Sequence, residues 1–219
     1  MKINNKINER INCLRSYLQK QKLDGYIQPR ADSFLGEYVP KNDERLQWIS
    51  GFSGSAGEIL ILMNKVILFT DSRYTIQATN ETKNTNIEVV ITSKTSIQNW
   101  LKINIKNKIK ISIDPWLYSY SNLKNYIHFG LNNNIQFIIL KKNPIDIFWK
   151  HNRNKPNSAI NKHPLKYSGV STQKKIHDLC QNMTKNKVDA YVVSQTDSLA
   201  WLLNIRGADL KHTPIILAR

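Results

Sequence analysis

Two serines stand in a glycine-rich segment, Gly51-Phe52-Ser53-Gly54-Ser55-Ala56-Gly57, where a hydrolase could carry its nucleophile. A nucleophile elbow needs glycine two residues before and two residues after the serine, on a turn from strand to helix. Ser53 lacks the second glycine and Ser55 lacks the first. A phosphate-binding loop also fits poorly, because the segment has no Gly-Lys-Ser/Thr ending and leads into a strand-like run. The glycines therefore predict a tight turn before a hairpin rather than catalysis.

Side chains that could bind a metal are scattered along the chain. The histidines stand far apart in the sequence, at His128, His151, His163, His177 and His212. No His-Glu-x-x-His motif and no paired-carboxylate spacing accompanies them. The sequence therefore predicts no metal site and no cofactor within these residues.

Asp71 and Arg73 follow an apolar, strand-like run, and functional side chains often lie where a strand ends. A buried ion pair between them, which would organise the turn, is the simpler expectation. A second polar group follows a helix-like segment that carries Trp201, and it consists of Asn204, Arg206, Asp209 and His212. Two alternatives explain this group equally well: a functional loop, or a capped helix end in which the arginine is hydrogen-bonded. All of these side chains are candidates for substrate approach or for contacts between domains.

Helix-like and strand-like segments mostly alternate through residue 140. Apolar residues at helical spacing predict helices over 8–22, 74–80, 97–101 and 119–129. Apolar and β-branched runs predict strands over 26–28, 58–63, 66–70, 87–91, 110–114 and 135–140, with a hairpin turn at Asn64-Lys65. This order predicts an α/β domain in which helices flank a mixed sheet.

Part of this pattern is repeated later in the chain. Residues Ile11, Leu14, Leu18, Leu23, Asp24 and Tyr26 recur at an offset of 165 as Ile176, Leu179, Met183, Val188, Asp189 and Tyr191. Residues Leu46, Trp48 and Gly54 recur at an offset of 153 as Leu199, Trp201 and Gly207. The second copy predicts helices over 171–183 and 198–205 and strands over 189–193 and 214–217. We expect a complete domain at 1–145, a proline-punctuated connector at 146–169 and a truncated second copy at 170–219.

The chain is strongly basic, with a formal net charge of +16 and a pI near 9.8. Such a charge is typical of proteins that bind nucleic acid or acidic partners. Its lysines are not interleaved with arginine and aromatic residues, and no nucleic-acid-binding motif is present. Compositional drift toward lysine, asparagine and isoleucine therefore explains the charge better, and we do not expect nucleic acid as a partner.

The sequence also indicates the cellular compartment in which the protein is found. No apolar run approaches the roughly 20 residues that a membrane span needs, so no membrane association is expected. The basic N-terminus has no apolar core behind it, which argues against a secretory signal. Cys13 and Cys180 lie in helix-like segments and are expected to be buried thiols in a reducing compartment. We therefore expect a cytoplasmic protein.

A collinear series of motifs covers essentially the whole chain. The motifs are Asp24-Gly25-Tyr26-Ile27, Gly36-Glu37-Tyr38-Val39-Pro40, Asp43-Glu44-Arg45-Leu46, Ser50-Gly51-Phe52-Ser53-Gly54-Ser55-Ala56-Gly57, Thr70-Asp71-Ser72-Arg73-Tyr74-Thr75-Ile76-Gln77-Ala78, Asn143-Pro144-Ile145-Asp146-Ile147-Phe148-Trp149, His163-Pro164-Leu165, Asp197-Ser198-Leu199-Ala200-Trp201-Leu202-Leu203-Asn204-Ile205-Arg206-Gly207-Ala208-Asp209 and His212-Thr213-Pro214. Together they closely resemble the N-terminal, creatinase-like region of Xaa-Pro aminopeptidases (aminopeptidase P). Ser72 departs from the resemblance, because the family usually has glycine there. If that position needs a positive φ, serine strains the turn.

The resemblance implies a creatinase/prolidase N-terminal-like fold, followed by a truncated second copy. In the long form of the family, two such domains precede a pita-bread catalytic domain that removes an N-terminal residue preceding proline. That domain binds two divalent metals, usually manganese, through two Asp, one His and two Glu, and the metals generate the attacking hydroxide. None of these ligands can be assigned here, so we expect the chain to be inactive alone. A separately encoded catalytic portion is the expected partner, and a homo-oligomer is a further expectation.

Two other functions remain open at this point. A decayed gene fragment without activity would leave the second copy with an unpaired sheet edge and an open core. A basic module that binds nucleic acid or an acidic partner would show an affinity that falls steeply as salt rises.

Overall fold

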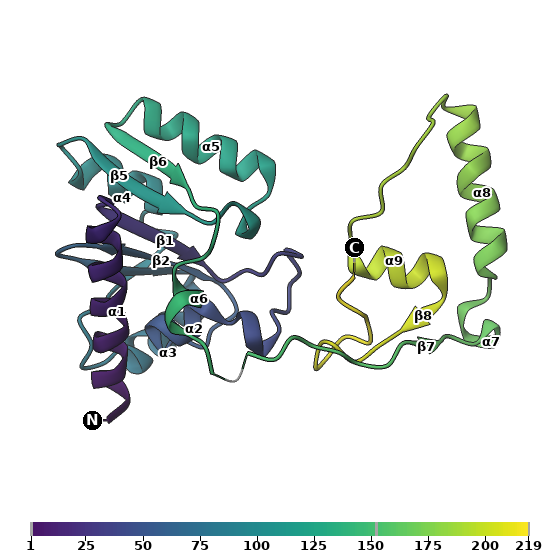
Figure 1. The fold of residues 1–219 in the computed structure, drawn as a ribbon, viewed down its shortest axis with the longest axis horizontal. Coiled ribbons are helices and arrows are strands. Elements are labelled where there is room, and N and C mark those ends of the chain that lie inside the picture. Colours follow the sequence, from purple (N-terminus) through teal and green to yellow (C-terminus); the bar gives the residue numbers. More distant parts are fainter. Residues whose placement is uncertain (1, 152, 219) are drawn as a thin grey trace. The chain divides into compact units, whose positions relative to one another are not determined.

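The computed structural model describes residues 2–151 and 153–218, and the chain divides into two units between Arg153 and Asn154. Unit 1 runs to Arg153 and unit 2 begins at Asn154. The helices and strands of unit 1 gather around a central sheet, whereas unit 2 consists mainly of helices and irregular chain (Figure 1). The predicted connector, 146–169, is thus shared between the units, and its residues through Arg153 belong to unit 1.

A mixed sheet forms the centre of unit 1. Among the described residues it has six strands, in the order β4-β3-β2-β1-β5-β6. The strands are β1 (Gly25–Pro29), β2 (Gly57–Leu62), β3 (Val66–Thr70), β4 (Glu88–Ile91), β5 (Ile109–Ile113) and β6 (Ile135–Ile139). Strand β2 runs antiparallel to β1 and β3, and the remaining neighbours are parallel. The predicted mixed sheet is confirmed, including the hairpin between β2 and β3.

Both faces of this sheet are covered by helices. The first core lies under α1 (Lys2–Lys20), α2 (Arg45–Ser50), α3 (Thr75–Glu81) and α6 (Ile145–Phe148), and the second lies under α4 (Ile97–Asn104) and α5 (Tyr120–Leu131). Strand β2 contributes to both cores, because successive strand residues face opposite sides. Ile59 and Ile61 belong to the first core, and Leu60 and Leu62 belong to the second. The continuous apolar run of β2 is therefore explained by burial on both faces.

Helix α1 forms because its apolar side chains recur every three or four residues. Ile7, Ile11, Leu14 and Leu18 lie on one face and are buried against the sheet. Burial of side chains of this size contributes about 1.5–3 kcal/mol each relative to exposure. Lys22 then adopts a left-handed backbone with a φ of 55°, and this conformation ends the helix.

The segment after β6 folds back onto unit 1. The side-chain amide of Asn143 donates a hydrogen bond to Gln28 at 3.0 Å inside the core. Arg45 donates to both carboxylate oxygens of Asp146, at 2.8 and 3.0 Å. Arg153 pairs with the same carboxylate at 2.7 Å. These contacts explain why the first part of the predicted connector belongs to the domain before it.

Unit 2 contains the two longer helices that the repeat predicts. Its elements are β7 (Asn161–Lys162), α7 (Leu165–Ser168), α8 (Thr172–Lys185), α9 (Thr196–Leu203) and β8 (Ile205–Arg206), and β7 pairs antiparallel with β8. Ser171 begins α8 as its N-cap, because its hydroxyl accepts a hydrogen bond from the backbone N–H of Lys174 at 3.2 Å. Helices α8 and α9 correspond to α1 and α2 of unit 1.

The strands predicted over 189–193 and 214–217 are not formed in the described part of unit 2. Strand β1, the counterpart of 189–193, lies between β2 and β5 and exchanges hydrogen bonds with both. A strand depends on such neighbours to satisfy its backbone groups. The strand prediction was wrong because the described part of unit 2 provides 189–193 with neither neighbour.

Cys13 and Cys180 are exposed, which corrects the prediction that both are buried. Both lie on helices, but outside the apolar faces. Cys13 precedes the buried Leu14 by one residue, and adjacent helical residues point in directions about 100° apart. As for the bilayer, no helix in the described ranges has the length and apolarity to cross it.

Candidate functional site

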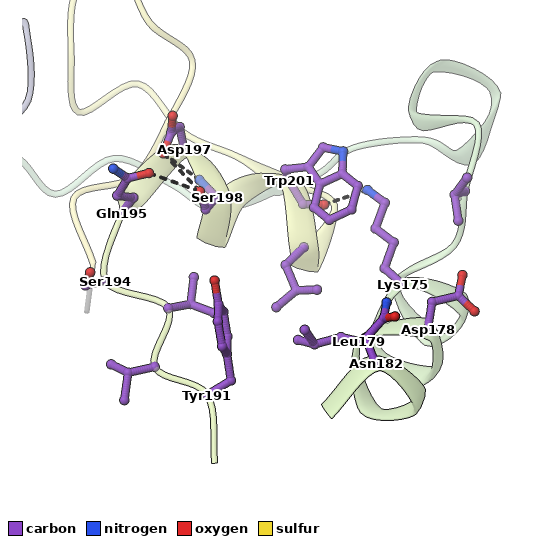
Figure 2. A pocket seen from close by; sticks show the side chains of 14 residues that line it. Lys175, Asp178, Leu179, Asn182, Tyr191, Ser194, Gln195, Asp197, Ser198 and Trp201 are labelled. Atoms are coloured by element: carbon purple, nitrogen blue, oxygen red, sulfur yellow. Dashed lines mark hydrogen bonds between the residues drawn. The ribbon is translucent and has the colours of Figure 1, made fainter. Parts of the chain in front are cut away.

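Lys175, Trp201 and Asn204 form a connected cluster in unit 2, and Figure 2 shows Lys175 beside the Trp201 ring. The Lys175 ammonium donates to the carbonyl oxygen of Trp201 and to Asn204 Oδ1, each at 2.6 Å. It also lies 4.1 Å from the centroid of the Trp201 indole, in a cation–π arrangement. Lys175 comes from α8, and the other two residues come from the end of α9. The cluster therefore holds the two helices together.

The Lys175 side chain is buried, which is unusual for lysine. Burial lowers the pKa of Lys175, and the nearby positive charge of Arg206 lowers it further. A lysine with a lowered pKa is a candidate nucleophile. Here, however, two hydrogen bonds and an aromatic face already engage the ammonium, so the geometry favours a structural role.

Unit 1 contains the same arrangement at the equivalent positions. Arg10, on α1, donates from its guanidinium to the carbonyl oxygen of Trp48, on α2. The guanidinium carbon lies 4.4 Å from the centroid of the Trp48 indole. Arg10 precedes Lys175 by 165 residues and Trp48 precedes Trp201 by 153, which are the offsets of the apolar repeat. The Lys175 cluster is thus a repeated feature of the fold.

The ends of the two second helices also correspond. Gly51 ends α2 with a φ of 80°, and Asn204 ends α9 with a φ of 52°. Asparagine tolerates this left-handed conformation better than most residues that carry a side chain. Its amide group donates to the carbonyl oxygen of Val170 at 2.8 Å, a bond that glycine cannot make. Asn204 therefore combines a helix C-cap with a contact to the segment before α8.

An open groove lies between α8, α9 and the irregular segment 191–195, with a volume of about 840 Å³ (Figure 2). The residues that line it include Leu179, Asn182, Tyr191, Val192, Asp197 and Trp201. Tyr191 is 63% exposed and Trp201 is 58% exposed, and Val192 is also exposed. Large apolar side chains that gather on a surface commonly mark a site of interaction. The groove is the candidate functional site of unit 2.

The remaining candidates of unit 2 lie in the chain that follows α9. Arg206 donates to the carbonyl oxygens of Ala200 and Ile205 at 3.2 and 2.8 Å, which caps the helix end. The Asp209 carboxylate accepts from the backbone N–H groups of Ser158 and Leu217, at 3.0 and 2.8 Å. Burial opposes the ionisation of Asp209, but these hydrogen bonds outweigh it, so the pKa of Asp209 is lowered. His212 lies exposed further along the same stretch.

In unit 1, Asp71 and Arg73 form the predicted ion pair, with 2.6 Å between the guanidinium nitrogen and the carboxylate oxygen. The prediction that this pair is buried was wrong. The Arg73 side chain is 68% exposed, because Arg73 lies on a one-turn helix at the surface, Ser72–Tyr74, which Asp71 caps. The side-chain hydrogen bond from Arg73 lowers the pKa of Asp71. Ser72 is not among the described residues with positive φ, so its replacement of glycine does not strain the turn.

Asp71 also lines a second cleft, of about 440 Å³, at the carboxyl ends of β1 and β3. Arg30 and Glu58 line the same cleft, and Arg30 pairs with Glu44 at 2.8 Å. Burial raises the pKa of Glu58, although the hydrogen bond from Tyr126 opposes the shift. Ligands of α/β sheets bind at the carboxyl ends of strands. Asp71 therefore lies where a ligand could bind, and its role in substrate approach remains a prediction.

The described residues do not fit a metal centre. Across 2–151 and 153–218, no group of three or more His, Cys, Asp or Glu side chains comes together in a way that could hold a metal ion. A dinuclear site needs several carboxylates around two ions.

Sequence reasoning missed Arg10, Lys175 and Asp146. The first two stand at the offset of the apolar repeat, so extending that comparison to polar positions would have found them. Asp146 carried no local signal, because its partner Arg45 lies 101 residues away in sequence.

Comparison with known proteins matches both units. Two family models described as the creatinase/prolidase N-terminal domain match residues 10–137 and 151–219. A probable Xaa-Pro aminopeptidase P from Paracoccidioides lutzii is 33% identical over 213 residues, which cover 96% of this chain and 35% of that protein. Its counterpart from Neosartorya fischeri is 33% identical over 214 residues, which cover 96% of this chain and 33% of that protein. The chain thus spans about a third of the length of these relatives.

A solved structure is also similar over nearly the whole chain. It is an X-prolyl aminopeptidase from Caenorhabditis elegans, described as a cytosolic enzyme with a di-nuclear active site. The TM-score is 0.87 and the sequence identity is 25%. The similarity covers 95% of this chain and 36% of that one, so most of that enzyme lies outside the matched region.

Proposed function

This chain belongs to the creatinase/prolidase N-terminal domain family, and we propose that it is the non-catalytic N-terminal portion of a metal-dependent Xaa-Pro aminopeptidase. One observation carries the proposal: the match to a relative named as an Xaa-Pro aminopeptidase P runs through both units and covers 96% of the chain. The repeated Arg10–Trp48 and Lys175–Trp201 pairs support it, because they identify two copies of one domain.

The proposed reaction removes an N-terminal residue that precedes proline. A dinuclear metal centre, of the kind described for the Caenorhabditis elegans enzyme, would supply the attacking hydroxide, and we propose manganese as the metal. The described residues of this chain do not fit such a centre. These residues alone would therefore be inactive, and the metal ligands would come from a catalytic portion outside them.

The proposed role of these residues is to pack against the catalytic portion and to shape the path by which peptides reach the metals. Asp71 at the unit 1 cleft and the cluster around Trp201 are the side chains proposed for it. Self-association of the chain is compatible with this role. We propose the cytoplasm as its location, in line with the description of the Caenorhabditis elegans enzyme as cytosolic. We propose neither nucleic acid nor a membrane as a binding partner.

Complementation tests the proposal. The probe is the part of the Paracoccidioides lutzii relative that follows the matched region, loaded with Mn²⁺. Release of the first residue of a proline-containing peptide is measured with and without excess of this chain. We expect the chain to increase the kcat/KM of the probe.

An unchanged kcat/KM at saturating chain would contradict the proposal. Unit 1 alone, residues 1–153, serves as a control polypeptide, because it lacks the second domain copy that the full chain provides. Chelation of the metal must abolish release in every sample, which excludes a contaminating metal-independent peptidase.

A further inference from the structure

A row of three side chains crosses the sheet in the unit 1 cleft. Pro29 of β1, Glu58 of β2 and Phe69 of β3 are direct neighbours across the strands, and all three line the cleft. Residues directly opposite each other in adjacent antiparallel strands lie on the same face of a sheet. The Glu58 carboxyl group is therefore flanked by the apolar ring of Pro29 and the aromatic ring of Phe69. All residues that line the cleft lie between Pro29 and Ile97, so it belongs to unit 1 alone.

The Glu58 carboxylate has a hydrogen-bond partner but no partner of opposite charge. The Tyr126 hydroxyl donates to Glu58 Oε2 at 2.8 Å. Among the described residues Glu58 forms no ion pair, although the chain contains 32 lysines and arginines. Loss of water around the carboxyl group raises the pKa of Glu58. A carboxylate that is withdrawn from water without a cation is costly, and such groups often mark sites that bind a ligand.

Two further polar groups near Glu58 lack a hydrogen-bond partner among the described residues. The Tyr118 hydroxyl is buried without one, and its ring packs edge-to-face on Tyr126, with centroids 5.5 Å apart. Burial raises the pKa of Tyr118, and the nearby negative charge of Glu58 raises it further. Arg30 Nε is also buried without a partner, and Arg30 lines the cleft. Buried polar groups without partners are rare, so three incomplete groups around one cleft indicate a missing polar ligand.

The charges along the cleft favour a positively charged ligand. Glu44 pairs with Arg30 at 2.8 Å, and Arg73 pairs with Asp71 at 2.6 Å, which leaves Glu58 as the carboxylate available to a ligand. A carboxylate beside an aromatic ring binds ammonium groups through charge-assisted hydrogen bonds and cation–π attraction. A metal ion fits less well, because no group of three metal-binding side chains comes together in the described ranges.

We propose that the unit 1 cleft binds a primary ammonium group, which donates to the Glu58 carboxylate beside the Phe69 ring. The cleft measures about 440 Å³, which is within the usual range for small-ligand sites. The N-terminus of a peptide suits it best, because the carbonyl oxygen that follows the ammonium would accept from Arg30 Nε. The ammonium site rests on the cleft alone. The choice of a peptide as its source rests also on the proposed function, since every substrate of that reaction has a free N-terminus.

Binding is tested by calorimetric titration of the full chain alone, without metal and without a catalytic portion. The probes are the amide of the peptide Ala-Pro-Ala, the same peptide with an acetylated N-terminus, and propylamine. At pH 7 we expect the free peptide and propylamine to bind and the acetylated peptide not to bind. Glu58→Gln should weaken binding of the free peptide by about tenfold or more, as for one partner of a buried charge pair. Glu88→Gln is the matched control, because Glu88 is an exposed glutamate on β4, outside the cleft.

Binding of the free peptide should weaken on both sides of neutral pH. As pH falls through the raised pKa of Glu58, the carboxylate takes up a proton and loses its charge. The groups near it do not titrate there, because the pKa values of Tyr118 and Tyr126 are raised, that of Asp71 is lowered, and Arg30 stays charged. As pH rises, the peptide loses its own proton near the α-amino pKa of about 7.7–8.0, whereas propylamine resembles lysine, with a pKa of about 10.4, and should remain bound.

The result that would overturn the proposal is equal binding of the free and acetylated peptides, no binding of any probe, or unchanged binding by Glu58→Gln. Thermal unfolding of Glu58→Gln confirms that any loss of binding does not come from loss of the fold. Binding of propylamine without binding of the free peptide would keep the ammonium site and identify a small amine as its ligand. Peptide binding without activation in the complementation assay would remove only the proposed function.

Discussion

The Lys175 ammonium lies 4.1 Å from the centroid of the Trp201 indole and donates to the carbonyl oxygen of the same residue at 2.6 Å. Arg10 and Trp48 make the same pair of contacts in unit 1. In each unit the pair connects the first long helix to the next, and it does so with a cation that is partly or fully withdrawn from water. Changes at these residues should therefore alter stability before they alter chemistry.

Replacing Lys175 with methionine should loosen α8 from α9. The Trp201 carbonyl and Asn204 Oδ1 would lose their charged donor, which costs about 1.5–3 kcal/mol for hydrogen bonds to a charged group. Hydrogen exchange of α8 and α9 measures this loss as a lower free energy of opening. Lys174→Met is the matched control, because Lys174 is exposed and its ammonium forms an i,i+4 pair with Asp178, worth about 0.3–0.5 kcal/mol. Equal effects of the two variants would contradict the assigned role.

Replacing Asp146 with alanine should release the segment that contains α6. Arg45 is buried and would lose both hydrogen bonds from its guanidinium to this carboxylate, although Asp43 still pairs with it at 2.9 Å. Because Asp146 is partly exposed, we expect a loss of about 1.5–3 kcal/mol in the free energy of unfolding of unit 1. Urea denaturation followed by tryptophan fluorescence checks this, since Trp149 stacks on Trp48. A loss below about 0.5 kcal/mol would show that the ion pair does not hold the segment.

Replacing Glu58 with glutamine should make stability less dependent on pH. Burial raises the pKa of Glu58, so the folded state keeps this proton to a higher pH than the unfolded state does. The stability it contributes is full below its unfolded pKa, about 4.3, and is lost as pH rises through the folded value. Glu58→Gln should thus gain stability relative to the original chain between pH 4 and pH 7, measured by thermal unfolding. A difference that shrinks over that interval would show that the shift has the opposite sign.

Replacing Ser72 with glycine should not stabilise the turn. Ser72 already lies in a one-turn helix that Asp71 caps, and it needs no positive φ. Glycine would only add conformational entropy to the unfolded chain, at a cost of about 0.5–1 kcal/mol. Thermal unfolding measures the change, and a clear gain in melting temperature would restore the strain hypothesis.

The sheet of unit 1 could be predicted because each strand carries its own local pattern. The run Val66–Thr70 is apolar up to Phe69 and ends in a β-branched threonine, and the predicted bounds are those of β3. Residues 189–193 carry a similar pattern, yet they form no strand in the described structure. A strand is completed by neighbours from distant parts of a chain, and a local pattern does not report whether they are present.

The candidate site was predictable in part. Trp201 and Asn204 stood out as residues around a helix end, and the structure brings both to Lys175. In the sequence, Lys175 does not differ from the many surface lysines, because its burial depends on its packing against α9. The exposure of the Asp71–Arg73 pair was missed for a related reason: spacing predicts that two residues meet, but only tertiary packing decides whether water reaches them.

The most direct test of the central claim is an assay of this chain alone. The chain is incubated with Mn²⁺ and a peptide whose second residue is proline, and the released N-terminal residue is quantified over time. We expect release no faster than in a solution of Mn²⁺ and peptide without protein. Release that rises in proportion to the chain and stops on chelation would contradict it, because the chain would then carry its own catalytic metal centre.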